Sequence, residues 1–140
     1  ITRLQNMGTP DYLISAATQL VLAQRLARRS CKDCRTPDED VTPKVLTDLG
    51  FSPELASRVK ALKGKGCAKC KDTGYKGRQG IYEILVVSKP VKEAILRQAT
   101  TPELREIAIK EGFQTMQDMG RRLIANGELN FREYERVLSS

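Results

Sequence analysis

The chain has 140 residues, of which 40% are hydrophobic and 29% charged, and its formal net charge is +7. This length supports one compact domain, or one core with a small satellite. The longest apolar runs, Leu20 to Ala23 and Ile84 to Val87, are far shorter than the roughly 20 residues that cross a bilayer. No basic segment leads into an apolar one, so we expect neither a membrane span nor a signal peptide. Because the first residue is not Met, we expect a piece of a longer protein.

The first expected element is a helix from about Pro10 to Arg29. It opens with a capping hydroxyl, a proline and an acidic residue at 9–11. Apolar residues then recur at helical spacing, at Leu13, Ala16, Ala17, Leu20, Ala23 and Leu26. Basic residues near its end, among them Arg25 and Arg28, would suit the negative pole of the helix dipole.

Two CxxC pairs are the strongest chemical signal: Cys31 with Cys34, and Cys67 with Cys70. Glycines surround the second pair and allow the tight turns of a zinc knuckle. The sequence contains no His, so a Cys₃His site cannot be built. Zinc accepts four sulfur ligands in a tetrahedron, and four thiolates leave no open position for catalytic water. We therefore predict one structural zinc ion held by all four cysteines.

Other states of the cysteines remain open. Iron in a rubredoxin-like Cys₄ setting is the main competing metal. Two disulfides or four reduced thiols are the alternatives without metal, although close CxxC pairs in a Lys-rich chain favour metal. A redox dithiol is a third alternative, but redox CxxC motifs normally occur singly on a thioredoxin-like unit.

Between the two pairs lie 32 residues that a metal would close into a loop. A polar, proline-interrupted loop is expected at 36–43. Two short helices should follow, one from Thr42 to Gly50 and one from Ser52 to about Gly64.

After the second pair, Ile81–Val87 predicts a strand because it is rich in β-branched residues. The remainder predicts helices that open at Thr101, cover Met116 to Ala125, and open again at Asn130 with a capping-box pattern. Apolar residues of this region are expected to pack the helices together: Ile107, Phe113, Met116, Met119, Leu123, Ile124, Phe131, Tyr134 and Leu138. The expected fold is mainly α with a small β component.

The positive charge is concentrated around the cysteines. Residues 58–78 contain eight Lys or Arg and one Asp, and residues 25–35 contain five Lys or Arg and one Asp. Some of these cations would stabilise deprotonated ligands. A basic zinc ribbon that binds nucleic acid is the alternative function, with phosphate contacts from Arg28, Arg29, Lys63, Lys65, Lys69, Lys71 and Lys76. With 5% aromatic residues and no Trp, however, the chain offers few stacking platforms, and we do not expect nucleic acid as the partner.

No segment matches the phosphate-binding loop GxxxxGK[ST]. Gly64-Lys65-Gly66 has the lysine but leads into a cysteine ligand. Together with the absence of His, this predicts that the chain alone is not an enzyme.

Several motifs together resemble one family. They are Val21 to Arg29, the two CxxC pairs, the run from Thr73 to Glu83 (TGYKGRQGIYE) and the late Glu111 to Met116 (EGFQTM). They closely resemble the carboxy-terminal part of the ATPases that drive type II secretion and type IV pilus assembly. The resemblance covers essentially the whole chain.

This resemblance implies a hexameric, RecA-like motor that is cytoplasmic and peripheral to the bacterial inner membrane. Its partners would be neighbouring subunits of a homo-hexamer and an inner-membrane platform protein, with Arg25 and Arg28 as possible interface residues. ATP and magnesium would bind in the parent protein only, at sites outside this chain. The pilus and secretion branches look alike over this region, so both remain open.

The resemblance also implies three segments. Residues 1–30 would be the end of the RecA-like ATPase core, 31–78 the tetracysteine zinc-binding element, and 79–140 a strand plus a helical C-terminal subdomain. The function expected for this part is zinc binding and coupling between subunits of the motor.

Overall fold

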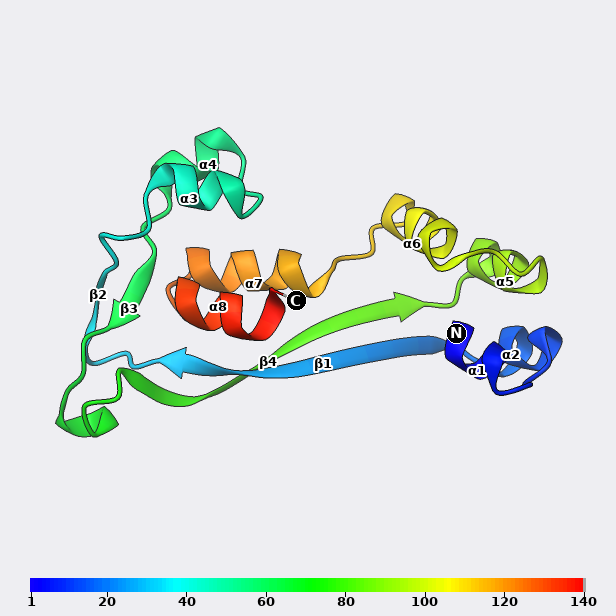
Figure 1. Cartoon of the computed structure of the whole chain (residues 1–140), viewed down its shortest axis with the longest axis horizontal. Coiled ribbons are helices and arrows are strands. Elements are labelled where there is room, and N and C mark those ends of the chain that lie inside the picture. The colour runs from blue at the N-terminus through cyan, green and yellow to red at the C-terminus, as the bar shows by residue number, and fades with distance from the viewer. Residues whose placement is uncertain (140) are drawn as a thin grey trace. The chain divides into compact units, whose positions relative to one another are not determined.

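The computed structural model describes residues 1–139, which form two compact units (Figure 1). Unit 1 consists of Ile1–Ala23 and Glu83–Thr115; unit 2 consists of Gln24–Tyr82 and the described residues from Met116 onward. Over the described residues, eight α-helices and one 3₁₀ helix together account for 45% of the chain, and two antiparallel two-stranded sheets account for 21%. The predicted fold class, mainly α with a small β component, is confirmed. The segment boundaries after residues 30 and 78 stay a prediction.

Unit 1 contains four helices, the first residues of one long strand and the last residues of another. The helices are α1 (Thr2–Asn6), α2 (Asp11–Ala17), α5 (Lys89–Leu96) and α6 (Thr101–Lys110). Its core contains Ile14, Val87, Val91, Ala94, Ile95, Ala99 and Leu104. The side-chain amides of Gln5 and Gln98 both donate to Asp11, at 2.7 and 2.9 Å, and so join α1, α2 and the turn after α5.

Unit 2 contains the cysteines and a larger core. Its elements are β2 (Arg35–Pro37), α3 (Pro43–Asp48), α4 (Pro53–Arg58), β3 (Leu62–Gly64), the 3₁₀ helix η1 (Ala68–Cys70), α7 (Met116–Ala125) and α8 (Phe131–Leu138). β2 pairs antiparallel with β3, with Thr36 opposite Lys63. Side chains of α3 and α4 share one buried cluster with those of α7 and α8, including Leu46, Ala56 and Ile124.

The two longest strands run through both units. β1 (Leu20–Ser30) pairs with β4 (Tyr75–Val86), and the N–H of Val87 donates to the carbonyl of Gln19 at 2.9 Å. The predicted strand is thereby confirmed, and it begins six residues earlier than expected.

The predicted helix over residues 10–29 is wrong beyond its first two turns. α2 ends at Ala17, Thr18 is already extended, and the remainder is β1. Leu20 and Leu26, which the helical spacing placed on one apolar face, are each more than half exposed on the strand. The backbone hydrogen bonds at the two ends of this pairing join Cys31 to Gly74 and Val87 to Gln19, which are 43 and 68 positions apart. Local helix propensity was therefore overridden by a pairing that a sequence window does not contain.

The shorter elements follow the sequence more closely. α3, α4, α6, α7 and α8 begin within one residue of the expected positions, and Thr42 and Ser52 accept the capping hydrogen bonds of α3 and α4. A reciprocal capping box forms at the start of α6, between Thr100 and Glu103. At the start of α8, the side chain of Asn130 accepts from the backbone N–H of Glu133, and the described cap has no reciprocal side-chain bond. α1, α5, β2 and β3 were not predicted as separate elements. None of the helices described here has the length and apolar character needed to cross a bilayer.

Glu133 is a fully buried carboxylate on α8. It accepts from the backbone N–H of Arg28 at 2.8 Å, from the Arg28 guanidinium at 2.8 to 3.2 Å, and from Arg136. Burial alone would raise the pKa of Glu133, but the hydrogen bonds from Arg136 and Arg28 lower it to about 2. The carboxylate therefore attaches α8 to β1 only while it is ionised.

Glu133→Gln tests this attachment. The folded pKa lies below the unfolded value of 4.5, so the ionised carboxylate stabilises the fold above that value and loses its effect as the pH falls toward 2. At pH 7 we expect the variant to be less stable by roughly 2 to 3 kcal/mol. The gap between the two proteins should close between about pH 5 and pH 2 in denaturant titrations.

The matched control is Glu54→Gln, which removes an exposed carboxylate paired with Arg58. It should change stability by less than about 0.5 kcal/mol at any pH. A gap for Glu133→Gln that stays constant from pH 7 to pH 2.5 would contradict the ionised attachment.

Candidate metal centre

The four cysteines come from two short loops of unit 2. Cys31 directly follows β1 and Cys34 directly precedes β2, while Cys67 caps η1 and Cys70 ends it. Cys31, Cys34 and Cys70 are buried, and Cys67 is half-buried. The structure thus brings together all four residues that the spacing singled out.

Their sulfur atoms have the arrangement that a tetrahedral metal site requires. All four Sγ atoms lie within 4.8 Å of one another. The separations are 3.9 Å for Cys31–Cys67, 3.9 Å for Cys34–Cys70 and 3.7 Å for Cys67–Cys70. Four sulfurs at about 2.3 Å from a central zinc ion would be about 3.8 Å apart. A disulfide would need about 2.05 Å, and all four cysteines are free. The cluster could therefore hold a metal ion.

Backbone N–H groups point at the sulfur of Cys70. The N–H of Cys67 donates to it at 3.2 Å and that of Gly74 at 3.3 Å. Burial opposes ionisation of Cys70, but these donors stabilise the thiolate and lower its pKa to about 6. Burial also raises the pKa of Cys34 to about 11. Without a metal, the thiols of Cys34 and Cys70 are thus unequal, and a bound divalent cation would favour the thiolate of Cys34.

Two glycines permit the close approach of the loops. A Cβ placed on Gly64 would lie 2.0 Å from the carbonyl oxygen of Gly74, and Gly74 itself has a φ of +76°. The N–H of Cys31 donates to that same carbonyl at 2.9 Å. Because no side chain fits at Gly64, the backbone crossing beside the cysteines requires glycine at this position.

An ion pair crosses the cysteine cluster. Lys69, which lies between Cys67 and Cys70, contacts Asp33, which lies between Cys31 and Cys34, at 2.9 Å. Their mutual hydrogen bond lowers the pKa of Asp33 and raises that of Lys69. The two CxxC loops are therefore joined by a charge pair as well as by the positions of their sulfurs.

The two candidate interface residues lie on β1. Arg25 donates to the carbonyl of Val137, and Arg28 forms the pair with Glu133 while its guanidinium lies 4.1 Å from the ring centre of Tyr75. Half of the Arg28 side chain remains exposed. Both arginines have partners within the chain, and a role between subunits stays a prediction.

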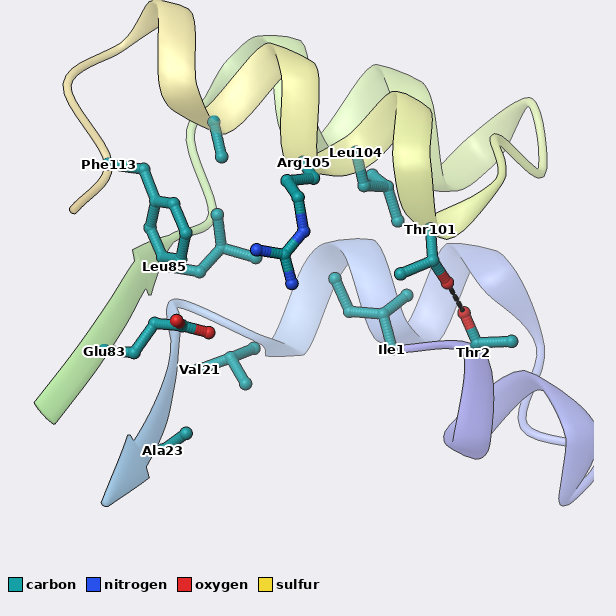
Figure 2. A pocket seen from close by; sticks show the side chains of 11 residues that line it. Ile1, Thr2, Val21, Ala23, Glu83, Leu85, Thr101, Leu104, Arg105 and Phe113 are labelled. Atoms are coloured by element: carbon teal, nitrogen blue, oxygen red, sulfur yellow. Dashed lines mark hydrogen bonds between the residues drawn. The ribbon is translucent and has the colours of Figure 1, made fainter. Parts of the chain in front are cut away.

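Unit 1 contains a separate cavity of about 160 Å³ (Figure 2). Figure 2 shows Arg105 extending into it from α6, with Glu83 on the strand at its edge and the hydroxyls of Thr2 and Thr101 joined across it at 3.0 Å. Most of the lining is apolar, including Val21, Leu85, Leu104 and Phe113. No cysteine lines this cavity, so it is independent of the cysteine cluster.

Sequence reasoning missed two buried polar groups of unit 2. Glu133 was taken as half of a capping box, although its carboxylate faces Arg28. Ser30 is 4% exposed and precedes Cys31 directly, and a single serine before a cysteine carries no signal in the sequence.

Comparison with known proteins gives a consistent result. The family described as Type II/IV secretion system protein matches residues 1–136. The Type IV pilus assembly ATPase PilB of Myxococcus xanthus is 36% identical over 133 residues, covering 95% of this chain and 24% of that protein. PilB of Thermus thermophilus is 42% identical over 123 residues, covering 86% of this chain and 13% of that protein.

A secretion protein is about as similar as the pilus ATPases. Type II secretion system protein E of Aeromonas hydrophila is 36% identical over 138 residues, covering 98% of this chain and 26% of that protein. The chain thus spans about a quarter or less of the length of these relatives. Because the family match extends over nearly every residue, the chain belongs to the type II/IV secretion system protein family.

Proposed function

We propose that this chain is the C-terminal, zinc-binding and subunit-coupling portion of a hexameric ATPase that powers type IV pilus assembly or type II protein secretion. The observation that carries the proposal is the convergence of four sulfurs at tetrahedral spacing in a chain of this family. The relatives on both branches have similar identity, so the proposal includes both.

The ligand set of the cluster fits zinc. Four cysteine ligands supply only soft sulfur donors, and a tetrahedral S₄ set selects zinc or iron among common metals. Four sulfurs fill the tetrahedral positions around a zinc ion, and three of the four cysteines are buried, as expected of a structural site. The metal would tie the end of β1 to the start of β4 and close the 32-residue segment between the pairs.

The exposed face of β1 supports the assignment of residues 1–30 to a larger RecA-like core. Leu20, Leu22 and Leu26 are 55%, 50% and 52% exposed. Several large apolar side chains exposed on one strand are typical of a surface that another part of a protein covers. Most of the length of the relatives is not part of this chain, and that missing part would cover these leucines.

Catalysis would belong to that missing part. The ATP and magnesium sites of the parent protein lie outside this chain, which carries no phosphate-binding loop. The chain would instead pass movement of the core to neighbouring subunits, with Arg25 and Arg28 at the interface, and to an inner-membrane platform. The parent motor would be cytoplasmic and peripheral to the inner membrane.

Metal analysis tests the first part of the proposal. Protein purified without added metal should contain one zinc and no iron per chain, and its four thiols should react only after unfolding. Removing zinc with a chelator should lower the free energy of unfolding by about 4 kcal/mol, the value expected for a cross-link closing this length of chain. Metal-free protein with an unchanged thermal midpoint would contradict a structural site.

Gly64→Ala tests the geometry of the loops. The added Cβ would clash with the backbone of Gly74, so the variant should bind zinc at least about tenfold more weakly in competition with a chromophoric chelator. Gly112→Ala is the control, because Gly112 has a positive φ but open space around it. That variant should lose about 1 kcal/mol of stability and keep the zinc affinity of the wild type.

The coupling role is tested in the full-length motor that contains this sequence. Cys67→Ser should leave nucleotide binding by the core intact but reduce hexamer assembly and ATP turnover by at least about tenfold, because the metal that joins the two CxxC loops loses one of its four ligands. Lys60→Gln, which changes an exposed residue of the same unit, should have no effect. A Cys67→Ser motor that assembles and turns over ATP like the wild type would remove the coupling role.

A further inference from the structure

A second cavity lies in unit 2 beside the cysteine cluster. Its volume is about 310 Å³, and it is lined by Arg29, Ser30, Lys32, Asp33, Lys76, Gly77 and Arg78. These residues come from the end of β1, the loop that follows it, and the start of β4. The volume is at the lower end of the roughly 300–1,000 Å³ range of small-molecule sites, so the cavity has room for a small ligand or a headgroup.

Its lining is strongly basic, with four cations and one carboxylate. The carboxylate of Asp33 is already neutralised by Lys69 at 2.9 Å, and Arg29 is paired with Glu128 at 3.0 Å. The side chains of the other three cations, Lys32, Lys76 and Arg78, are exposed and form no ion pair or side-chain hydrogen bond among residues 1–139, although the charge of Lys76 helps to lower the pKa of Asp33. Three cations without an ion pair therefore line one cavity.

The hydroxyl of Ser30 distinguishes this cavity from an ordinary basic surface. Ser30 is 4% exposed, and its backbone N–H donates to the carbonyl of Glu128 at 3.0 Å. Its Oγ is buried without any hydrogen-bond partner, the one side-chain atom of which this is true in the described part of the chain. Buried hydroxyls are normally paired because leaving one unpaired is unfavourable. Ser30, with its unpaired hydroxyl, and three cations without an ion pair thus line the same cavity.

We propose that this cavity binds a phosphate-type oxyanion, with Ser30 donating a hydrogen bond and Lys32, Lys76 and Arg78 neutralising its charge. A phosphate group carries close to two negative charges and three acceptor oxygens at neutral pH, which a set of several cations and a hydroxyl satisfies better than a single carboxylate would. The group could belong to a soluble phosphate or to a lipid headgroup. The proposal rests on the cavity alone and not on the motor function.

The same cations have a competing explanation. Four thiolates around a divalent ion carry a formal charge of −2, and nearby lysines would stabilise them. In that case loss of Lys76 would weaken metal binding and leave no anion site. Metal affinity and phosphate affinity must therefore be measured on the same variants.

The experiment is a titration of the ¹⁵N-labelled, metal-loaded chain with inorganic phosphate at constant ionic strength. Saturable amide shifts should be confined to residues 29–33 and 76–78. Ser30→Ala and Lys76→Gln should each raise the dissociation constant at least about fivefold with unchanged metal content, whereas Lys60→Gln, an equal charge change elsewhere in unit 2, should alter it less than about twofold. Arg78→Gln takes the place of Ser30→Ala if that variant does not fold.

A parallel arm distinguishes the two sources of the phosphate group. The chain is sedimented with phosphatidylcholine vesicles that contain phosphatidic acid. Co-sedimentation that depends on Lys76 would identify a lipid headgroup as the ligand, even if free phosphate binds poorly. Binding of free phosphate with no preference for these vesicles would identify a soluble ligand. Three results would overturn the proposal. The first is that neither free phosphate nor the vesicles bind, and the second is that Lys60→Gln weakens phosphate binding as much as Lys76→Gln does. The third is that Lys76→Gln loses its metal but still binds phosphate like the wild type.

Discussion

The antiparallel pairing of β1 with β4 is the constraint on which the rest of the structure depends. β1 ends at Ser30, and the N–H of Cys31 continues toward β4 by donating to Gly74 at 2.9 Å. In an antiparallel pair the end of one strand lies beside the start of the other. The residues after β1 and those before β4 must then meet, and these residues are the two CxxC loops. The register of β1 and β4 thus brings the two CxxC loops together, and the spacing of the cysteines then places their sulfurs side by side.

A buried charge attaches α8 to the same strand. An isolated carboxylate in an apolar core would be strongly unfavourable, and Glu133 is tolerated because two guanidinium groups and a backbone N–H satisfy both of its oxygens. The backbone contact is specific to the position of Arg28 on an extended strand, since a helical Arg28 would use that N–H within its own helix. If residues 10–29 formed the expected helix, the buried carboxylate of Glu133 would therefore lose the hydrogen bond from this backbone N–H.

The parts of the structure that were predictable from sequence are those set by local chemistry. Cysteine spacing identified all four residues of the cluster, and proline, capping residues and glycine located α3, α4, α6 and α7. β1 was mistaken for a helix because its leucines happen to fall at helical spacing and leucine is a good helix former. The exposure of these leucines and the pairing with a strand far along the chain are set by the tertiary structure, so a short sequence window could not reveal them. The unpaired hydroxyl of Ser30 and the cavity beside it depend in the same way on the register of β1 and β4.

The distribution of cations shows why net charge alone was a poor guide to function. Seven basic residues were considered as contacts for nucleic-acid phosphates. Four of these form ion pairs inside the chain: Arg28, Arg29, Lys63 and Lys69. A continuous basic stripe of the kind that follows a nucleic-acid backbone is thereby interrupted. The other three are Lys65, Lys71 and Lys76, and of these only Lys76 lines the small cavity, together with Lys32 and Arg78. Such an arrangement matches a single compact anion, because a polymer would need positive charge at repeated positions along the surface.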